Sequence, residues 1–156
     1  METWQKLLKQ LKLEYMQKST PQAFEASGGY TMKVQPYTDK TANGLTKCIE
    51  DFIKHQGGYA NRISTTGLMR KIKGEMKYTK GNSNKGAADV RILFNGRCAD
   101  IEIKIGRDQQ SEAQKKEQVR IERAGGLYFI AKSFPDFLQW WQMQGFEVPQ
   151  LKQMVK

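Results

Sequence analysis

Residues 88–105 read ADVRILFNGRCADIEIKI, and their pattern predicts the centre of a β-sheet. Two apolar runs flank the pair Asn95-Gly96. Such a pair is the strongest short signal for a tight hairpin turn, because both residues tolerate a positive φ. The stretch therefore predicts two antiparallel strands, over residues 88–94 and 97–105.

The second predicted strand separates apolar from charged side chains, because successive side chains point to opposite faces of a strand. One face carries Ile101, Ile103 and Ile105, and the other carries Asp100, Glu102 and Lys104. An edge strand with a solvated polar face would explain this pattern. However, the hairpin also puts Asp89 nearly opposite Glu102, and two adjacent carboxylates repel unless a cation lies between them. Oxygen ligands favour Mg²⁺ or Mn²⁺, and Lys104 could orient or deprotonate a water and offset charge on a phosphate.

The flanking sequence predicts helices and strands in alternation. Helices are expected over residues 3–17, 45–56, 111–124 and 134–144, and strands over 59–63 and 127–132, the last buried on both faces. Residues 1–43 form an amphipathic helix and a connector with a short helix over 22–26, residues 44–144 the main domain, and 145–156 a tail. The first helix either docks on its own domain or forms an arm facing DNA or a second copy of the chain.

The composition narrows the class of protein. With 156 residues, 38% hydrophobic and 27% charged, the chain suits one globular domain, and its net charge of +10 favours nucleic acid over a membrane as partner. The single His55 excludes sites built on two histidines. Cys48 and Cys98 form no CxxC pair, which argues against zinc fingers and disulfide scaffolds and fits a reducing cytoplasm. We expect neither a membrane span nor a signal peptide.

The segment from residue 62 to residue 85 is strongly basic and rich in glycine, so much of it is expected to be loop or hairpin. It has seven cationic residues and one acid, Glu75; the cationic residues are Arg62, Arg70, Lys71, Lys73, Lys77, Lys80 and Lys85. An ordinary solvated loop would tolerate this composition. Because the segment leads directly into Asp89, we interpret it as the surface that contacts DNA phosphates.

These motifs together carry a family resemblance. Asp89 followed by Glu102-Ile103-Lys104 resembles the D…(D/E)xK signature of the PD-(D/E)XK, or restriction-endonuclease-like, nucleases. The KGxxD motif that ends at Asp89, the Asn-Gly turn, Gln114 in the next helix and Gly125-Gly126 before an apolar strand resemble the VRR-NUC branch. The resemblance covers residues 44–142.

The resemblance implies an α/β fold with an α-β-β-β-α-β core and a mixed central sheet, preceded here by the N-terminal helical extension. It implies Mg²⁺, replaceable by Mn²⁺, bound by Asp89, Glu102 and the backbone carbonyl of Ile103, with Lys104 as catalytic lysine and Gln114 supporting the site. Glu50 would match the acidic residue that the family carries on its first helix, which contributes to the metal site, often through water. Helical periodicity alone does not choose between Glu50 and Asp51. Gln114 has a second interpretation, because Ser111 to Gln114 is also a capping box.

The predicted function is therefore a metal-dependent DNA endonuclease in a bacterial or phage-infected cytoplasm. Small stand-alone members of the branch are often phage-like, cut branched DNA such as Holliday junctions, and usually act as homodimers. Two alternatives stay open. One is a non-catalytic DNA-binding module with a vestigial nuclease site, and the other is a nuclease directed to flaps or nicks.

Overall fold

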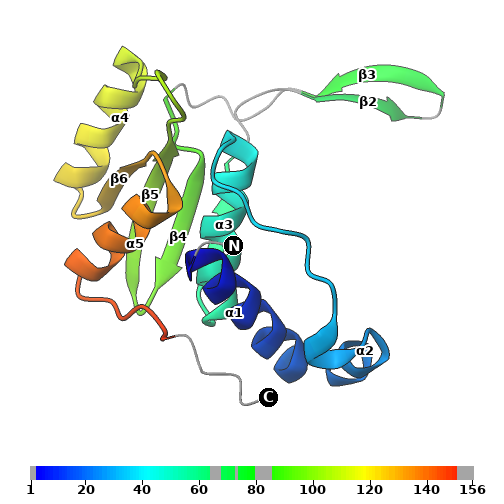
Figure 1. Cartoon of the computed structure of the whole chain (residues 1–156). Coiled ribbons are helices and arrows are strands. Elements are labelled where there is room, and N and C mark those ends of the chain that lie inside the picture. Colours follow the sequence, from blue (N-terminus) through cyan, green and yellow to red (C-terminus); the bar gives the residue numbers. More distant parts are fainter. Residues whose placement is uncertain (1–2, 64–67, 73, 80–85, 151–156) are drawn as a thin grey trace.

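The computed structural model describes residues 3–63, 68–72, 74–79 and 86–150. It is a mixed α/β fold (Figure 1). In chain order the elements are α1 (Thr3–Ser19), α2 (Pro21–Ala26), a 3₁₀ turn (Gly29–Thr31), α3 (Ala42–His55), β1 (Tyr59–Arg62), β2 (Leu68–Ile72), β3 (Glu75–Thr79), β4 (Val90–Phe94), β5 (Arg97–Ile103), α4 (Glu112–Arg123), β6 (Leu127–Ala131) and α5 (Phe134–Met143). All the helices and strands expected from the sequence are present, with ends shifted by a few residues.

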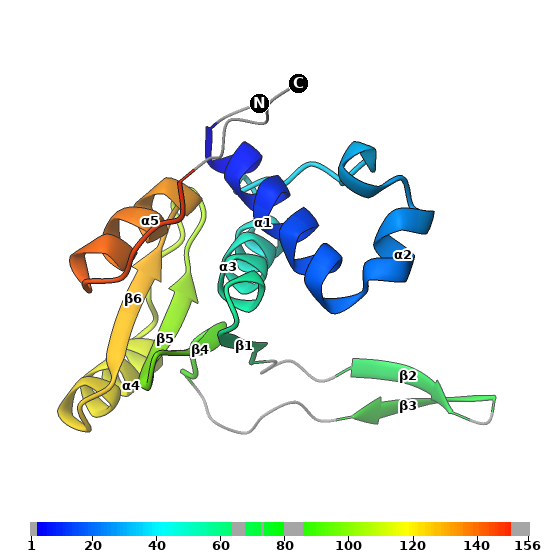
Figure 2. The ribbon, with the colours of Figure 1, turned by 90° about the horizontal axis from the view of Figure 1, so that it is seen from below.

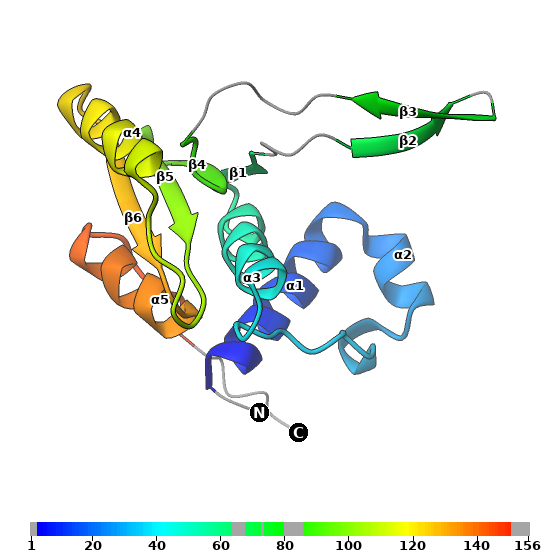
Figure 3. The ribbon, with the colours of Figure 1, turned by 90° about the horizontal axis from the view of Figure 1, so that it is seen from above.

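Four strands form the central sheet in the order β1-β4-β5-β6. The pairs β1–β4 and β4–β5 are antiparallel, whereas β5 and β6 are parallel, so α4 serves as the crossover between them. Among the described residues, strands β2 and β3 pair with each other and with no other strand, and their hairpin projects away from the sheet in all three views (Figures 1, 2 and 3). The basic segment thus contains a hairpin, as expected.

The predicted turn joins β4 to β5. Asn95 and Gly96 have φ values of 48° and 76°, the positive pair that a two-residue type I′ turn requires. Val90 lies opposite Ile101 and Phe94 opposite Arg97, which is the predicted register. Strand β4 starts two residues later than expected, so Asp89 immediately precedes it.

One hydrophobic core lies on the face of the sheet that α3 and α5 cover, whereas α4 lies on the other side (Figure 1). Phe52 of α3 packs edge to face against three rings of α5, those of Phe134, Phe137 and Trp141, and the Phe52 and Trp141 ring centroids are 5.7 Å apart. The expectation that β6 is buried on both faces was wrong. Leu127, Phe129 and Ile130 are only partly buried, because β6 is an edge strand of the sheet.

Helix α1 packs on α3 and belongs to the same core. Trp4, Leu8 and Leu11 are buried, and the Trp4 ring centroid lies 5.3 Å from that of Phe134 in α5. The helix therefore docks on its own domain, and these side chains cannot also serve as an arm that faces DNA or a second copy of the chain. Tyr15, near the end of the same helix, is exposed. Within the described ranges, no helix has the length and apolar character needed to cross a bilayer.

Candidate functional site

The charged face of β5 is buried. Only 3% of Asp100, 1% of Glu102 and 7% of Lys104 is exposed, because β5 is an inner strand and α4 packs over this face. The alternative of a solvated edge strand is therefore wrong. Burying charged side chains is costly unless each meets a partner, so their partners define what this face can do.

Asp100 is neutralised by its cross-strand neighbour. Arg91 lies opposite it on β4 and donates from Nε and one terminal nitrogen to the two carboxylate oxygens, at 2.7 and 2.8 Å. Such a bidentate pair satisfies both oxygens of the carboxylate. Asp100 is thus held in an ion pair, which leaves Asp89 and Glu102 as the acids available for chemistry.

Asp89 and Glu102 meet at one end of the sheet. Because Val90 pairs with Ile101, Asp89 stands next to Glu102, and its Oδ2 accepts a hydrogen bond from the Ile103 backbone N–H at 2.9 Å. The Asp89 backbone carbonyl accepts from the N–H of Ile63 at 2.8 Å, which fixes this residue to the end of β1. The hairpin register therefore brings the two carboxylates together, as the sequence predicts.

Glu102 has one satisfied oxygen and one unsatisfied oxygen. Its Oε1 accepts from Lys104 Nζ at 3.0 Å and from Gln114 Nε2 at 2.5 Å. Its Oε2 is buried and has no hydrogen-bond partner in the part of the chain that the structure describes. The pKa of Glu102 is raised to about 7, mainly by burial and also by the nearby charge of Asp89, although Lys104 opposes both effects. A buried oxygen of this kind beside a second carboxylate suits a hard cation, with the Ile103 carbonyl next along the strand.

Lys104 lies between two acids. Its ammonium group contacts Glu102 and, at 3.3 Å, Oδ2 of the more exposed Asp108. Burial alone would lower the pKa of Lys104, but the hydrogen bonds and charges of Glu102 and Asp108 outweigh it and raise the pKa. Lys104 therefore enters the site as a cation held in a fixed position.

Gln114 forms the capping box of α4 and also contacts the acidic site, so the contacts of both interpretations are present. Its Oε1 accepts from the Ser111 backbone N–H at 2.9 Å while its own N–H donates to Ser111 Oγ at 3.3 Å, which completes the capping box of α4. Its Nε2 is the group that donates to Glu102. The first turn of α4 is thereby tied directly to the acidic end of β5.

Gly86 of the KGxxD motif explains how the chain approaches Asp89. Its φ is +90°, and a Cβ at this position would overlap the backbone of Ala113 and Gln114. Only glycine combines this conformation with so close an approach. The KGxxD motif could be recognised in the sequence. The reason why it needs a glycine, which is the contact with the start of α4, is visible only in the structure.

The two acids of α3 that periodicity left undecided are both engaged elsewhere. Asp51 accepts from the Tyr37 hydroxyl at 2.8 Å and from Lys47 at 2.9 Å, so it faces the connector before α3. Glu50 pairs with Lys54 at 3.1 Å. Among the described residues neither acid bonds to Asp89 or Glu102, and no group of three or more His, Cys, Asp or Glu side chains is gathered to hold a metal. No contact among the described residues therefore supports the expectation that Glu50 contributes to the metal site.

Four of the seven residues expected to contact DNA are among the described residues. Arg62 is exposed at the end of β1, Arg70 and Lys71 lie on β2, and Lys77 lies on β3. Lys73, Lys80 and Lys85 fall outside the described residues. In sequence the hairpin lies between Ile63 and Asp89, and these two residues are held together by the hydrogen bond from the Ile63 N–H to the Asp89 carbonyl.

Sequence reasoning missed Tyr128. This residue of β6 lies in register with Asp100, and its hydroxyl is buried without a hydrogen-bond partner among the described residues. Burial, and then the charge of Glu102, raise the pKa of Tyr128. Its place on the charged face follows from the parallel pairing of β5 with β6, which no local pattern in residues 127–131 reveals.

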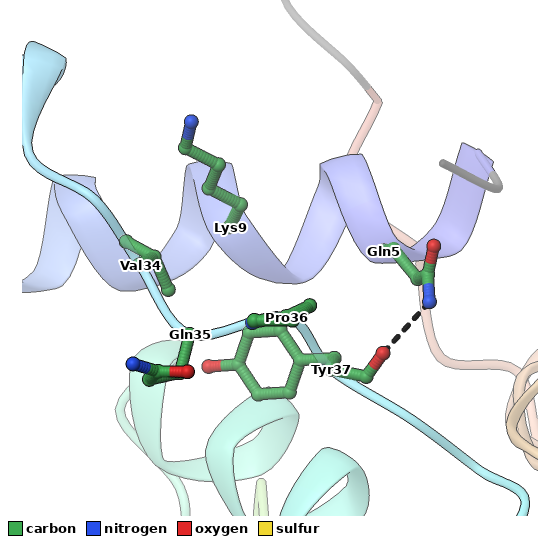
Figure 4. Close-up of a pocket in the computed structure, with 6 residues that line it drawn as sticks. All are labelled: Gln5, Lys9, Val34, Gln35, Pro36 and Tyr37. Carbon is green, nitrogen blue, oxygen red and sulfur yellow. Dashed lines mark hydrogen bonds between the residues drawn. The ribbon is translucent and has the colours of Figure 1, made fainter.

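A pocket elsewhere carries no comparable chemistry. It has a volume of about 230 Å³ and lies between α1 and the connector, where it is lined by Gln5, Lys9, Val34, Gln35, Pro36 and Tyr37 (Figure 4). Gln5 closes one side by donating to the Tyr37 carbonyl at 2.7 Å, and the Lys9 ammonium points away from the Tyr37 ring. It shares no residue with the acidic pair.

No protein-family model matches the chain, and no curated protein matches it significantly in sequence. The site is characterised by two adjacent carboxylates, one of which has a buried oxygen without a partner among the described residues, and by a lysine fixed beside them.

Proposed function

We propose that this protein is a metal-dependent DNA endonuclease of the restriction-endonuclease-like type. The observation that carries the proposal is the position of Asp89 beside Glu102, whose Oε2 is buried without a hydrogen-bond partner among the described residues. The Lys104 ammonium lies 3.0 Å from the other oxygen of Glu102. The order α3, β1, β4, β5, α4, β6 is also the order that the D…ExK resemblance implies, which supports the same conclusion.

Each residue has a distinct role in phosphodiester hydrolysis. Asp89, Glu102 and the Ile103 carbonyl would hold Mg²⁺ or Mn²⁺, which when bound polarises the phosphoryl oxygen and lowers the pKa of a water. Lys104 orients that water and offsets negative charge on the phosphate. Gln114 keeps Glu102 in position from α4. Ionised Glu102 is the ligand, so a cation and the proton compete for it.

The decisive experiment is cleavage of a panel of labelled DNA substrates in Mg²⁺ and in EDTA. The panel contains a Holliday junction, a flap, a splayed arm, and nicked, linear and single-stranded DNA. We expect cleavage in Mg²⁺ that Asp89→Asn and Glu102→Gln abolish. Asp100→Asn is the matched control, because it removes an acid of the same strand face that Arg91 already neutralises. Full activity in EDTA would refute the proposal, and DNA binding without cleavage in any metal would favour the non-catalytic module.

We further propose branched DNA as the substrate and a homodimer as the active form, because a four-way junction needs two opposed cuts and a two-fold dimer supplies them. The interface must lie outside the stripe formed by Trp4, Leu8 and Leu11, which the core already buries. Light scattering of the protein with and without junction DNA measures the assembly. A monomer on the junction would point instead to a flap- or nick-directed nuclease, which needs one cut.

A further inference from the structure

A second hollow lies directly beside the candidate site. It has a volume of about 280 Å³ and is formed where the loop after β5, the first turn of α4 and the end of β6 meet. Its polar walls are Lys104, Asp108, Gln109, Gln110, Lys115 and Lys132. Lys104 is shared with the candidate site, so whatever occupies this hollow lies next to the acidic pair.

The charged side chains that line this pocket have a net positive charge, which favours binding of an anion. Three lysines from three different elements face one carboxylate, that of Asp108. Lys104 is held by Glu102 and Asp108, but Lys132 is exposed and forms no ion pair with any residue that the structure describes. Lys115 pairs at 2.7 Å with Glu112, an exposed acid three residues earlier on the same helix. Such exposed pairs are weak, so Lys115 is free to turn to another anion.

The size of the pocket selects the kind of anion. Pockets for whole drug-sized ligands begin at roughly 300 Å³, so one of about 280 Å³ suits a single phosphate group with its ester oxygens rather than a complete nucleotide. The side-chain amides of Gln109 and Gln110 add neutral donors for its oxygens. Lysines from separate elements bind phosphate as point charges and read no base.

We propose that the pocket formed by Lys104, Lys115 and Lys132 binds an internal backbone phosphate of the DNA strand, adjacent to the phosphate that is cut. This proposal rests on the proposed nuclease function and adds a contact surface separate from the β2–β3 hairpin. It gives the strand a second fixed point, so that the scissile phosphate is placed over Asp89 and Glu102 rather than merely near them.

The test measures DNA affinity in EDTA, where no cleavage occurs, by fluorescence anisotropy of a labelled junction and a labelled duplex over a series of salt concentrations. Lys132→Gln removes a cation that no described residue needs, and Lys115→Gln is a second variant on another element. Lys116→Gln is the matched control, because Lys116 is exposed on the same helix turn and does not line the pocket. Circular dichroism verifies that each variant is folded.

Each phosphate contact that is lost should reduce the slope of log affinity against log salt by about 0.9. Between 50 and 200 mM salt, wild type should therefore lose roughly threefold more affinity than Lys132→Gln, whereas Lys116→Gln should follow wild type. Equal slopes for Lys132→Gln and Lys116→Gln would overturn the proposal, as would the absence of DNA binding by wild type. Because this readout needs no metal, a protein that shows the slope change but never cuts DNA would refute the nuclease and leave the pocket standing.

A terminal phosphate is the other source of the same chemistry. Nicked duplexes that carry either a 5′-phosphate or a 5′-hydroxyl at the nick distinguish the two. We expect wild type to bind both equally. A preference for the 5′-phosphate that disappears in Lys132→Gln would overturn the assignment to an internal phosphate.

Discussion

Replacing Glu102 by glutamine tests the energetics of the acidic pair without any assumption about substrate. In the folded protein the pKa of Glu102 stands at about 7 instead of 4.5, so the folded state binds its proton more tightly than the unfolded chain does. Folding stability therefore decreases as pH rises between these two values. Because the carboxyl pKa rises from 4.5 in the unfolded chain to about 7 in the folded protein, ionising Glu102 lowers the free energy of unfolding at pH 8 by about 3 kcal/mol relative to its value below pH 4.5.

Glutamine keeps the shape of the side chain and can still accept from Gln114, but it does not titrate. We expect wild type and Glu102→Gln to have similar unfolding free energies near pH 4.5, and the variant to be more stable by up to about 3 kcal/mol at pH 8 without metal. Urea unfolding followed by tryptophan fluorescence reports this, because Trp141 is fully buried. Other titrating groups are present in both proteins, so the difference between the two curves isolates Glu102.

Magnesium provides the second half of the test. A cation that binds ionised Glu102 stabilises the folded wild type by mass action, by about 2.7 kcal/mol at a concentration one hundred times its Kd. The glutamine variant should gain much less. Parallel pH profiles for the two proteins in EDTA would refute the reasoning, because they would mean that the buried carboxylate costs nothing to ionise.

Three further changes to the chain have expected outcomes. Gly86→Ala should destabilise the protein by more than about 1 kcal/mol in urea unfolding and weaken metal binding, because its Cβ meets the start of α4; Gly57→Ala, with a similar positive φ but open space around it, is the control, and equal effects would argue against the close approach. Lys104→Met should preserve metal binding in calorimetry and reduce turnover by roughly 10²–10⁴, and near wild-type turnover would remove Lys104 from the mechanism. A chain that begins at Lys40 should lose its cooperative thermal transition in circular dichroism, because Trp4, Leu8 and Leu11 are core residues; a stable truncated protein would contradict that.

Local patterns were sufficient for the parts of the fold that local chemistry determines. The Asn95-Gly96 turn specified the hairpin register, and this register alone placed Asp89 beside Glu102. The capping box of α4 was likewise readable from Ser111 and Gln114. These features depend on residues close together in the chain, or directly opposite each other across one turn.

Features that depend on how distant elements pack were not predictable in this way. An amphipathic helix has the same stripe whether it covers its own core or another molecule, so periodicity could not place Trp4 against Phe134. The burial of Asp100, Glu102 and Lys104 required knowing that β6 and α4 cover β5. The lysine pocket is hidden from sequence for the same reason, since its three cations come from separate elements.

The hydrogen bond from the Ile63 N–H to the Asp89 carbonyl has a consequence for how this protein can change over evolution. It closes residues 64–88 into a loop whose two ends are clamped at the edge of the sheet. Once such ends are fixed, doubling the length of the loop between them costs only about 0.6 kcal/mol of closure entropy. The part of this segment that precedes Gly86 can therefore be lengthened, shortened or exchanged for another without altering the register of β4 and β5. A chimera that carries a foreign hairpin between these residues should keep its carboxylates in place while acquiring a new preference in what it binds.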